Sequence, residues 1–277
     1  MSFAGLTALW IQITGTSCNL RCSHCLNASG PRDPWLKPLD ASVVERAIAD
    51  AEAYGVREIY FTGGEPFLHP AILRLVERAL AVAATTVLTN GTLITPAIAD
   101  ALADLVERSR YSLEIRVSVD DPEAESNDAV RGKGSFARAT RGIRLLHARG
   151  LLPILTSAEI RPGSWSDRFA RFSTMLRGLG VDRPRIKLLP LFPIGRARTE
   201  SEERLTNELL EGFDRTTLQC AGARVVADGG IYACPILAGV PEARMSGAAL
   251  GDAFGPVSLD HKACVTCWRS GATCRND

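Results

Sequence analysis

Short apolar segments alternate with longer segments of helical periodicity over roughly the first two thirds of the chain. Most of the apolar segments contain β-branched residues and are bounded by polar or turn-forming positions, a pattern typical of buried strands. We therefore expect six strands in this region, at Ala8–Thr14, Glu58–Thr62, Thr85–Thr89, Leu113–Val119, Pro153–Ile160 and Arg185–Leu191.

The segments between these strands have apolar residues at helical spacing. The first such pattern follows Asp40 and stops at Gly55, a residue suited to the position after a helix. A second opens at Thr95, an N-cap residue that is followed by proline at the first helical position. A third begins at Ser135. Six strand–helix units predict an α/β fold with a parallel sheet that curls.

Composition narrows the class of protein. The chain has 277 residues, which allows one or two domains, and 46% of them are hydrophobic. Lys and Arg number 32 against 31 Asp and Glu, so no basic footprint indicates a nucleic-acid partner. The N-terminus lacks a charged signal region, and no apolar run approaches the roughly 20 residues that span a bilayer. Eight cysteines without an export signal then favour metal ligation in a reducing, cytoplasmic compartment.

Three of these cysteines form one short motif. Cys18, Cys22 and Cys25 have the spacing C-x3-C-x2-C, which supplies three thiolates from a single loop. A [4Fe–4S] cube has four irons, so three thiolates leave one iron open to a substrate or cofactor. The alternatives are a structural zinc loop or cysteines that only pack. Zinc loops usually draw four ligands from two paired knuckles, and no C-x2-C partner lies within twenty residues of this motif.

A second motif follows the strand expected at Glu58–Thr62. The run Thr62-Gly63-Gly64-Glu65-Pro66 comes directly after it, and a Gly-Gly pair on its own would indicate no more than a turn. Taken together, the two motifs resemble those of the radical S-adenosylmethionine (radical SAM) superfamily. His24 stands where that family usually has an aromatic residue before the third cysteine. The resemblance implies a partial (β/α)6 TIM barrel over roughly residues 8–195.

Active sites of such barrels lie at the C-terminal ends of the strands. Asn90 and Ser118 follow the third and fourth strands there, although both also fit ordinary turns. The resemblance implies that Gly63 and Gly64 bind the methionine amino group of SAM. It implies that Ser118 and Arg131 contact its ribose or carboxylate, and it places His24, Glu65 and Asn90 at the same site. Arg131 also fits a solvated loop, and Arg196 is a further candidate catalytic residue at the barrel mouth.

The last third of the chain has a different pattern. A polar, helix-like bridge at residues 198–217 precedes a hairpin at residues 224–233 with an Asp-Gly turn. Four cysteines surround the hairpin and a short helix after it, and four thiolates would close the shell of a cluster or of a structural zinc ion. The spacing resembles the SPASM/twitch extension of radical SAM enzymes, which implies one auxiliary [4Fe–4S] cluster. We expect domains at residues 1–197 and 198–277, with the auxiliary ligands Cys220, Cys234, Cys264 and Cys267.

The resemblance also implies a reaction. Electron transfer from the reduced cluster cleaves SAM to a 5′-deoxyadenosyl radical, which abstracts hydrogen from an unactivated carbon. We expect a small polar metabolite as substrate, dehydrogenated rather than epimerised, and a reducing partner such as flavodoxin or ferredoxin. The alternative is a peptide-modifying enzyme with a separate leader-binding partner, because only 17 residues precede Cys18. A further alternative, outside the enzymes, is a non-catalytic protein that binds an Fe–S cluster or zinc.

One cysteine is left over. Cys274 lies outside both ligand sets, seven residues after Cys267. A thiol at this place can donate a hydrogen atom to a substrate radical, as an epimerase requires. The alternatives are a free tail cysteine and a substitute cluster ligand. We expect Cys274 to be dispensable for turnover, as a dehydrogenase would allow.

Overall fold

One mixed sheet of eight strands organises the molecule, in the order β6-β5-β4-β3-β2-β1-β7-β8. The computed structural model describes all residues except 33, 161–162, 201–202 and 272–277. Strands β1 to β7 run parallel and β8 runs antiparallel to β7. The strands are β1 (Ala8–Gln12), β2 (Glu58–Thr62), β3 (Ala84–Thr89), β4 (Leu113–Ser118), β5 (Ile154–Ala158), β6 (Arg185–Leu189), β7 (Ala223–Ala227) and β8 (Gly230–Tyr232).

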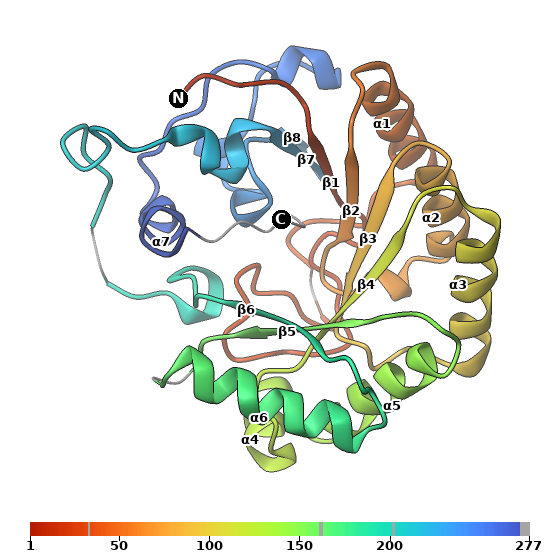
Figure 1. The fold of residues 1–277 in the computed structure, drawn as a ribbon. Coiled ribbons are helices and arrows are strands. Elements are labelled where there is room, and N and C mark those ends of the chain that lie inside the picture. Colours follow the sequence, from red (N-terminus) through yellow and green to blue (C-terminus); the bar gives the residue numbers. More distant parts are fainter. Residues whose placement is uncertain (33, 161–162, 201–202, 272–277) are drawn as a thin grey trace.

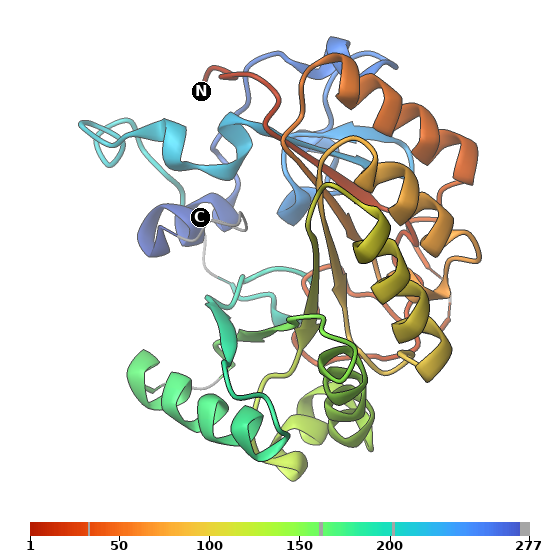
Figure 2. The ribbon, with the colours of Figure 1, turned by 45° about the vertical axis from the view of Figure 1, so that its right-hand side comes forward.

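Helices cover the outer face of this sheet (Figure 1), and a second view shows α1 to α3 packed side by side against the strands (Figure 2). The α/β fold with a partial TIM barrel is thereby confirmed. No helix among the described residues has the length and apolarity needed to cross a bilayer. The α-helices are α1 (Ala41–Ala53), α2 (Ile72–Leu80), α3 (Pro96–Arg108), α4 (Ala124–Arg131), α5 (Ser135–His147), α6 (Trp165–Gly178) and α7 (Lys262–Ser270).

Successive side chains along each strand point to opposite faces of the sheet, and this alternation separates two hydrophobic regions. On β1, Leu9 and Ile11 face the helices and belong to the large core between the sheet and its helical cover. Ala8 and Trp10 point to the other face, where Trp10 stacks on Tyr60 of β2 with ring centroids 4.1 Å apart. Such an aromatic pair contributes roughly 0.5–1.5 kcal/mol beyond the area it buries. The stacked pair fills the inner side of the barrel below the strand ends.

The predicted hairpin forms, but it extends the barrel sheet. β7 pairs with β8 across the turn at Asp228 and Gly229, as the Asp-Gly sequence predicts. β7 also pairs in parallel with β1, with Ala223 opposite Ala8. The domain boundary that we place between residues 197 and 198 stays a prediction. Strands from both sides of this boundary belong to the same sheet.

The bridge at residues 198–217 differs from the helix that we expected. Its described residues form turns and one 3-10 turn, η3 (Arg215–Thr217), with no α-helix. Leu205 and Leu210 instead reach the small core around α7. Gly212 has a φ of +70°, which ends any helical path there. Thr206 and Asn207, both poor helix formers, add to the local preference for turns.

Candidate active site

The three-cysteine motif lies on the loop that leaves β1. A bridge between Ser17 and Gly30 closes this loop, and the Cys18 N–H donates to the Gly30 carbonyl at 3.0 Å. Two of its sulfurs accept backbone hydrogen bonds, Cys18 Sγ from the Leu20 N–H at 3.4 Å and Cys25 Sγ from the Ser29 N–H at 3.3 Å. N–H groups directed at sulfur stabilise thiolates and cluster ligands. We call residues 18–30 the cysteine loop.

Burial acts against ionisation of these cysteines when they carry no metal. It raises the pKa of Cys18 to about 12 and also raises the pKa of Cys22. A thiolate at either place therefore needs a positive partner, which the irons of a cluster supply.

The two glycines after β2 allow a close approach to the cysteine loop. A Cβ on Gly64 would lie 2.0 Å from the Ser17 carbonyl oxygen and 2.9 Å from the Cys18 Cβ. Gly63 has a φ of +141°, where side chains other than glycine are strained, and a Cβ there would lie 2.4 Å from Thr14 Oγ1. Only glycine fits at both positions, so the second motif packs directly against the first.

Glu65, expected at the SAM site, is fully buried and engaged within the protein. One carboxylate oxygen accepts from Thr89 Oγ1 at 2.7 Å and from the Phe67 N–H at 3.1 Å. The other accepts from the Asn90 N–H at 2.7 Å. Burial outweighs these bonds and raises the pKa of Glu65 to about 7. These contacts connect the loops after β2 and β3, and Glu65 does not line the cavity described below, so its contact with SAM stays a prediction.

Asn90 connects Glu65 to the cysteine loop. Its Nδ2 donates to Asn19 Oδ1 at 2.8 Å and lies 3.7 Å from Cys18 Sγ. Its Oδ1 accepts from the Thr92 N–H at 2.9 Å. Asn90 also lines the cavity described below, so the structure places it at the site that the sequence predicted.

A buried carboxylate joins two predicted residues. Asp120, just after β4, lies 2.6 Å from Arg131 Nε and 3.1 Å from His24 Nε2 through its Oδ2 atom. Burial opposes its ionisation, but Arg131 and His24 outweigh burial and hold the pKa of Asp120 well below its usual range. Arg131 is therefore an ion-paired residue at the cavity wall, not a solvated loop arginine. Asp120 was missed from the sequence because an Asp before a turn is common.

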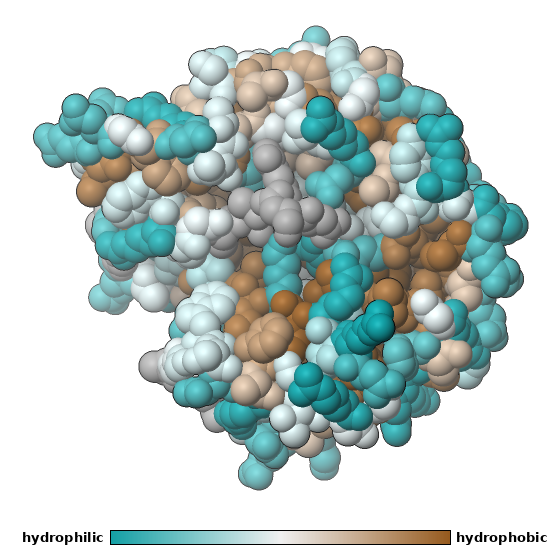
Figure 3. All heavy atoms as spheres, in the orientation of Figure 1, coloured by the Kyte–Doolittle hydropathy of each residue, from teal (hydrophilic) through white to brown (hydrophobic). Residues whose placement is uncertain are grey.

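A cavity of about 250 Å³ opens at the C-terminal ends of the strands. All three motif cysteines line it, together with His24, Gly63, Gly64, Asn90, Ser118 and Arg131. Figure 3 shows hydrophobic side chains gathered in a hollow near the centre of this face. The sequence predicted these polar residues but not the apolar part of the wall, which includes Leu26, Leu88, Leu191, Phe192 and Ile236.

Several buried polar atoms in this wall have no hydrogen-bond partner in the described part of the chain, and two of them lie on strands. Trp10 Nε1 and Thr156 Oγ1 are buried, form no hydrogen bond, and belong to residues that line the cavity. Buried donors and acceptors are usually satisfied, so unpaired ones beside a cavity indicate a ligand. Their signal in the sequence was weak, because both lie within strands that also fit an ordinary core.

Arg196, expected at the barrel mouth, binds the back of the cysteine loop. It lies in η2 (Gly195–Ala197), and its guanidinium donates to the carbonyls of Cys22 at 2.7 Å, Ala28 at 2.8 Å, and Ser29. A Cβ on Gly195 would lie 2.3 Å from the Cys25 carbonyl oxygen. These contacts support a positioning role for Arg196, which does not line the cavity.

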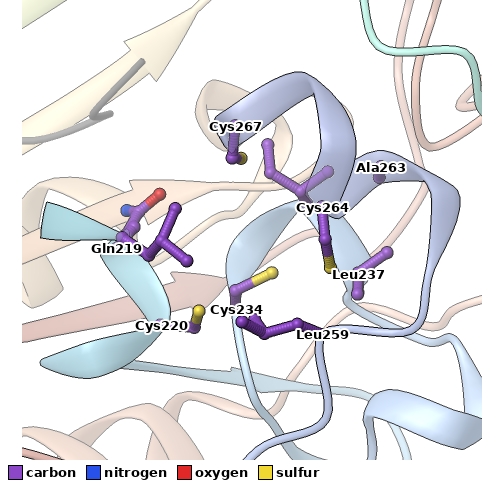
Figure 4. A pocket seen from close by; sticks show the side chains of 10 residues that line it. Gln219, Cys220, Cys234, Leu237, Leu259, Ala263, Cys264 and Cys267 are labelled. Atoms are coloured by element: carbon purple, nitrogen blue, oxygen red, sulfur yellow. The ribbon is translucent and has the colours of Figure 1, made fainter. Parts of the chain in front are cut away.

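The second cysteine set surrounds a smaller apolar cavity, the four-cysteine site (Figure 4). Cys220 comes from η4 (Gln219–Ala221), Cys234 follows β8, and Cys264 and Cys267 lie on α7. Burial raises the pKa of Cys234 well above its usual value and that of Cys264 to about 11. Cys274 lies outside the described residues.

The donors at both sites fit iron–sulfur clusters. At the first site, three cysteines share one cavity with a glycine pair that only a close approach explains. At the four-cysteine site, Gln219 Nε2 is buried without a hydrogen-bond partner among the described residues, and a cluster sulfur would accept from it. Three or more His, Cys, Asp or Glu side chains arranged for a single metal ion do not occur in the described part of the chain.

Parts of this sequence are similar to known proteins. Mycofactocin maturase MftC of Mycobacterium tuberculosis (strain CDC 1551 / Oshkosh) is 35% identical over 161 residues, 57% of this chain and 39% of its own length. GTP 3′,8-cyclase of Chlorobaculum tepidum is 30% identical over 178 residues, 62% of this chain and 51% of its own length. The chain thus spans about two fifths to one half of the length of these two relatives.

Solved structures share the fold. Streptococcus suis SuiB bound to S-adenosylmethionine superposes with a TM-score of 0.70 at 17% identity, covering 93% of this chain and 67% of that chain. The anSMEcpe structure with bound AdoMet and Cp18Cys peptide gives 0.66 at 15% identity, with 94% and 82% covered. The radical SAM superfamily pattern itself matches residues 13–160, more than half of the sequence. The chain therefore belongs to the radical SAM superfamily, whose members bind S-adenosylmethionine and a [4Fe–4S] cluster.

Proposed function

We propose that this radical SAM enzyme removes a hydrogen atom from a carbon of a peptide side chain and then oxidises the substrate radical, with a second cluster held by the four-cysteine site. The observation that carries the proposal is the cavity wall. Its apolar residues share one cavity with the three motif cysteines and suit an apolar or aromatic side chain. The relatives named mycofactocin maturase agree with a peptide better than with the small polar metabolite that the sequence favoured.

The GTP 3′,8-cyclase relatives make a nucleotide the second candidate substrate. A triphosphate requires several cationic side chains or metal ions. Among the described residues that line the cavity, Arg131 is the only arginine or lysine, and Asp120 already pairs with it. The charge of the cavity therefore favours the peptide.

When bound, the cluster and SAM supply a carbon-centred radical that abstracts hydrogen. The residues of the chain bind and orient SAM and the substrate. Gly63 and Gly64 leave room for the methionine moiety of SAM, and Arg131, oriented by Asp120, is suited to its carboxylate. Trp10 Nε1 and Thr156 Oγ1 are free to bind the substrate backbone. The apolar wall excludes water from the reacting carbon.

Reconstituted protein with changed cysteines tests the two sites. The variant Cys18→Ala/Cys22→Ala/Cys25→Ala is expected to keep about four irons and to lose reductive SAM cleavage completely. The variant Cys264→Ala/Cys267→Ala is expected to retain SAM cleavage and to form no product. If the triple variant still releases 5′-deoxyadenosine, the site assignment is wrong. Product formation at the native rate by the double variant contradicts a role for the second cluster.

Substrate-dependent SAM cleavage separates the candidate substrates. Reduced enzyme is incubated with a pool of synthetic peptides that together contain every side chain, or with GTP, and the rate of 5′-deoxyadenosine release is compared with the rate in buffer. We expect stimulation by peptides alone, with deuterium transfer from labelled side chains to 5′-deoxyadenosine. Stimulation by GTP alone, or none by the peptides, contradicts the proposal.

A further inference from the structure

Arg224 of β7 is a completely buried arginine beside the four-cysteine site. Its side chain donates only to carbonyl oxygens, those of Ala253 at 2.6 Å, Gly255 at 2.9 Å, Ala223 at 2.7 Å and Cys220 at 3.1 Å. The guanidinium also lies over the ring of Phe3, with 3.9 Å from Cζ to the ring centroid. Hydrogen bonding of the guanidinium is thus satisfied, while its positive charge is not neutralised by these groups.

Two other arginines with little side-chain exposure each pair with a carboxylate. Arg116 pairs with Glu114 at 2.8 Å, and Arg131 pairs with Asp120 at 2.6 Å. No carboxylate pairs with Arg224 in the described part of the chain, and the charged groups that act on it are Cys220 and Cys234. Burying a lone charge is expensive unless a countercharge is present. Burial accordingly lowers the pKa of Arg224 to about 10, although both thiols act in the opposite direction.

An anion at the four-cysteine site would remove this cost. Four thiolates carry a charge of −4, and a [4Fe–4S]2+ core leaves a net charge of −2. Its one-electron reduction adds a further negative charge, which a fixed cation nearby stabilises. Gln219, which lines the same cavity as the four cysteines, has a buried Nε2 without a hydrogen-bond partner among the described residues.

We propose that Arg224 is the internal countercharge of an anionic cluster held by Cys220, Cys234, Cys264 and Cys267, and that it raises the reduction potential of this cluster. The inference rests on the second cluster of the proposed function. Arg224 makes that cluster a better electron acceptor for a substrate radical. It touches neither SAM nor substrate, so it acts through the cluster.

The midpoint potential of the second cluster tests the inference. It is measured by EPR-monitored redox titration in the background Cys18→Ala/Cys22→Ala/Cys25→Ala, where only the four-cysteine site holds iron. With Arg224→Met we expect the ratio of reduced to oxidised cluster at a fixed potential to fall about tenfold, a shift of about 59 mV to more negative values. Arg224→Lys keeps the charge and is expected to stay near the parent value.

Arg116→Met is the matched control, because it removes a buried strand arginine that lies outside both cysteine sites and has its own carboxylate. It is expected to leave the potential unchanged. An unchanged potential in Arg224→Met, or equal shifts in Arg224→Met and Arg224→Lys, overturns the inference, since loss of packing would then explain the result. If the parent itself holds no cluster at the four-cysteine site, the proposed second cluster fails, whatever Arg224 does.

Unfolding provides a second measurement, which compares the effect of Arg224→Met with and without the second cluster. In Cys264→Ala/Cys267→Ala, which cannot hold the second cluster, the charge of Arg224 has lost its counterpart. Arg224→Met also removes hydrogen bonds to four carbonyls, so we expect it to lower the urea midpoint in both backgrounds, but less in this double variant than in the cluster-loaded protein. If Arg224→Met lowers the midpoint as much there as in the cluster-loaded protein, Arg224 stabilises the fold without reference to the cluster, and the inference is wrong.

Discussion

A single guanidinium holds the cysteine loop from behind. Arg196 donates to the carbonyls of Cys22, Ala28 and Ser29, and Gly195 allows its backbone to approach Cys25. Each neutral hydrogen bond contributes about 1 kcal/mol net, and bonds from a charged donor contribute more. Arg196 therefore fixes the spacing of the three cysteines although it touches none of their sulfurs.

Removal of this guanidinium should loosen the first cluster. In Arg196→Ala protein that also carries Cys264→Ala/Cys267→Ala, we expect iron release to a chelator to be at least about tenfold faster, from the loss of about 2–3 kcal/mol of loop contacts. Arg198→Ala, an exposed arginine two residues further on, is the control. Equal release rates in the two variants would contradict the positioning role.

At the scale of residues, the sequence predicted the site residues that lie close together along the chain. Cys18, Cys22 and Cys25 lie within eight residues, so their shared site follows from the chain alone. Trp10 and Thr156 contribute to the same cavity from β1 and β5, and their inward direction depends on the register and curvature of the sheet. Glu65 was predicted as a SAM contact because it belongs to a motif, but its burial against Thr89 and Asn90 is a tertiary property.

At the scale of elements, the start of α5 depends on a side chain from α4. Ser135, where the sequence predicts that the helical pattern begins, is the first residue of α5, and Asp128 of α4 accepts from the N–H groups of Gly134 at 2.5 Å and Phe136 at 2.8 Å. Partial burial acts against the charge of Asp128, but these N–H groups outweigh it and lower its pKa. Local sequence predicted where this helix begins, whereas its capping group came from another helix.

Replacing Asp128 should destabilise the protein in a pH-dependent way. Because the folded pKa is lowered, the charged form stabilises the fold above the unfolded pKa of about 3.9, and this contribution disappears as the pH falls through the folded value. We expect Asp128→Ala to lose about 1–2 kcal/mol of unfolding free energy at neutral pH and progressively less in acid. Urea titrations at several pH values measure this, with the exposed Asp104→Ala as control. A loss that does not depend on pH would exclude the charge as its cause.

At the scale of the whole molecule, the barrel sheet contains strands from both ends of the described chain. β1 lies between β2 and β7, and Trp10 and Tyr60 share a small core with Ala223 and Val225. The order of strands β1 to β6 follows from alternating strand–helix units. The pairing of β7 with β1 could not be predicted in this way, because the sequence of a hairpin does not indicate which strand it pairs with in the sheet.

A chain cut after Ala197 should therefore fail to fold as an independent barrel. It keeps β1 to β6 but leaves the edge of β1 unpaired and Trp10 without its neighbours on β7. We expect loss of cooperative thermal unfolding, followed by circular dichroism. Full-length Cys264→Ala/Cys267→Ala keeps β7 and separates the loss of the strand from the loss of a cluster. A truncated chain that melts as cooperatively as this control would show two independent units.

The pairing of β1 with β7 also imposes a delay during translation. From Gln12 at the end of β1 to Ala223 at the start of β7, 211 residues must be added by the ribosome. At roughly 5–20 residues per second, the first strand waits about 10–40 s for its neighbour. During that interval its open side is available to chaperones and to other nascent chains. The yield of native enzyme in a cell should consequently respond to translation speed and chaperone supply, even where the purified protein is stable.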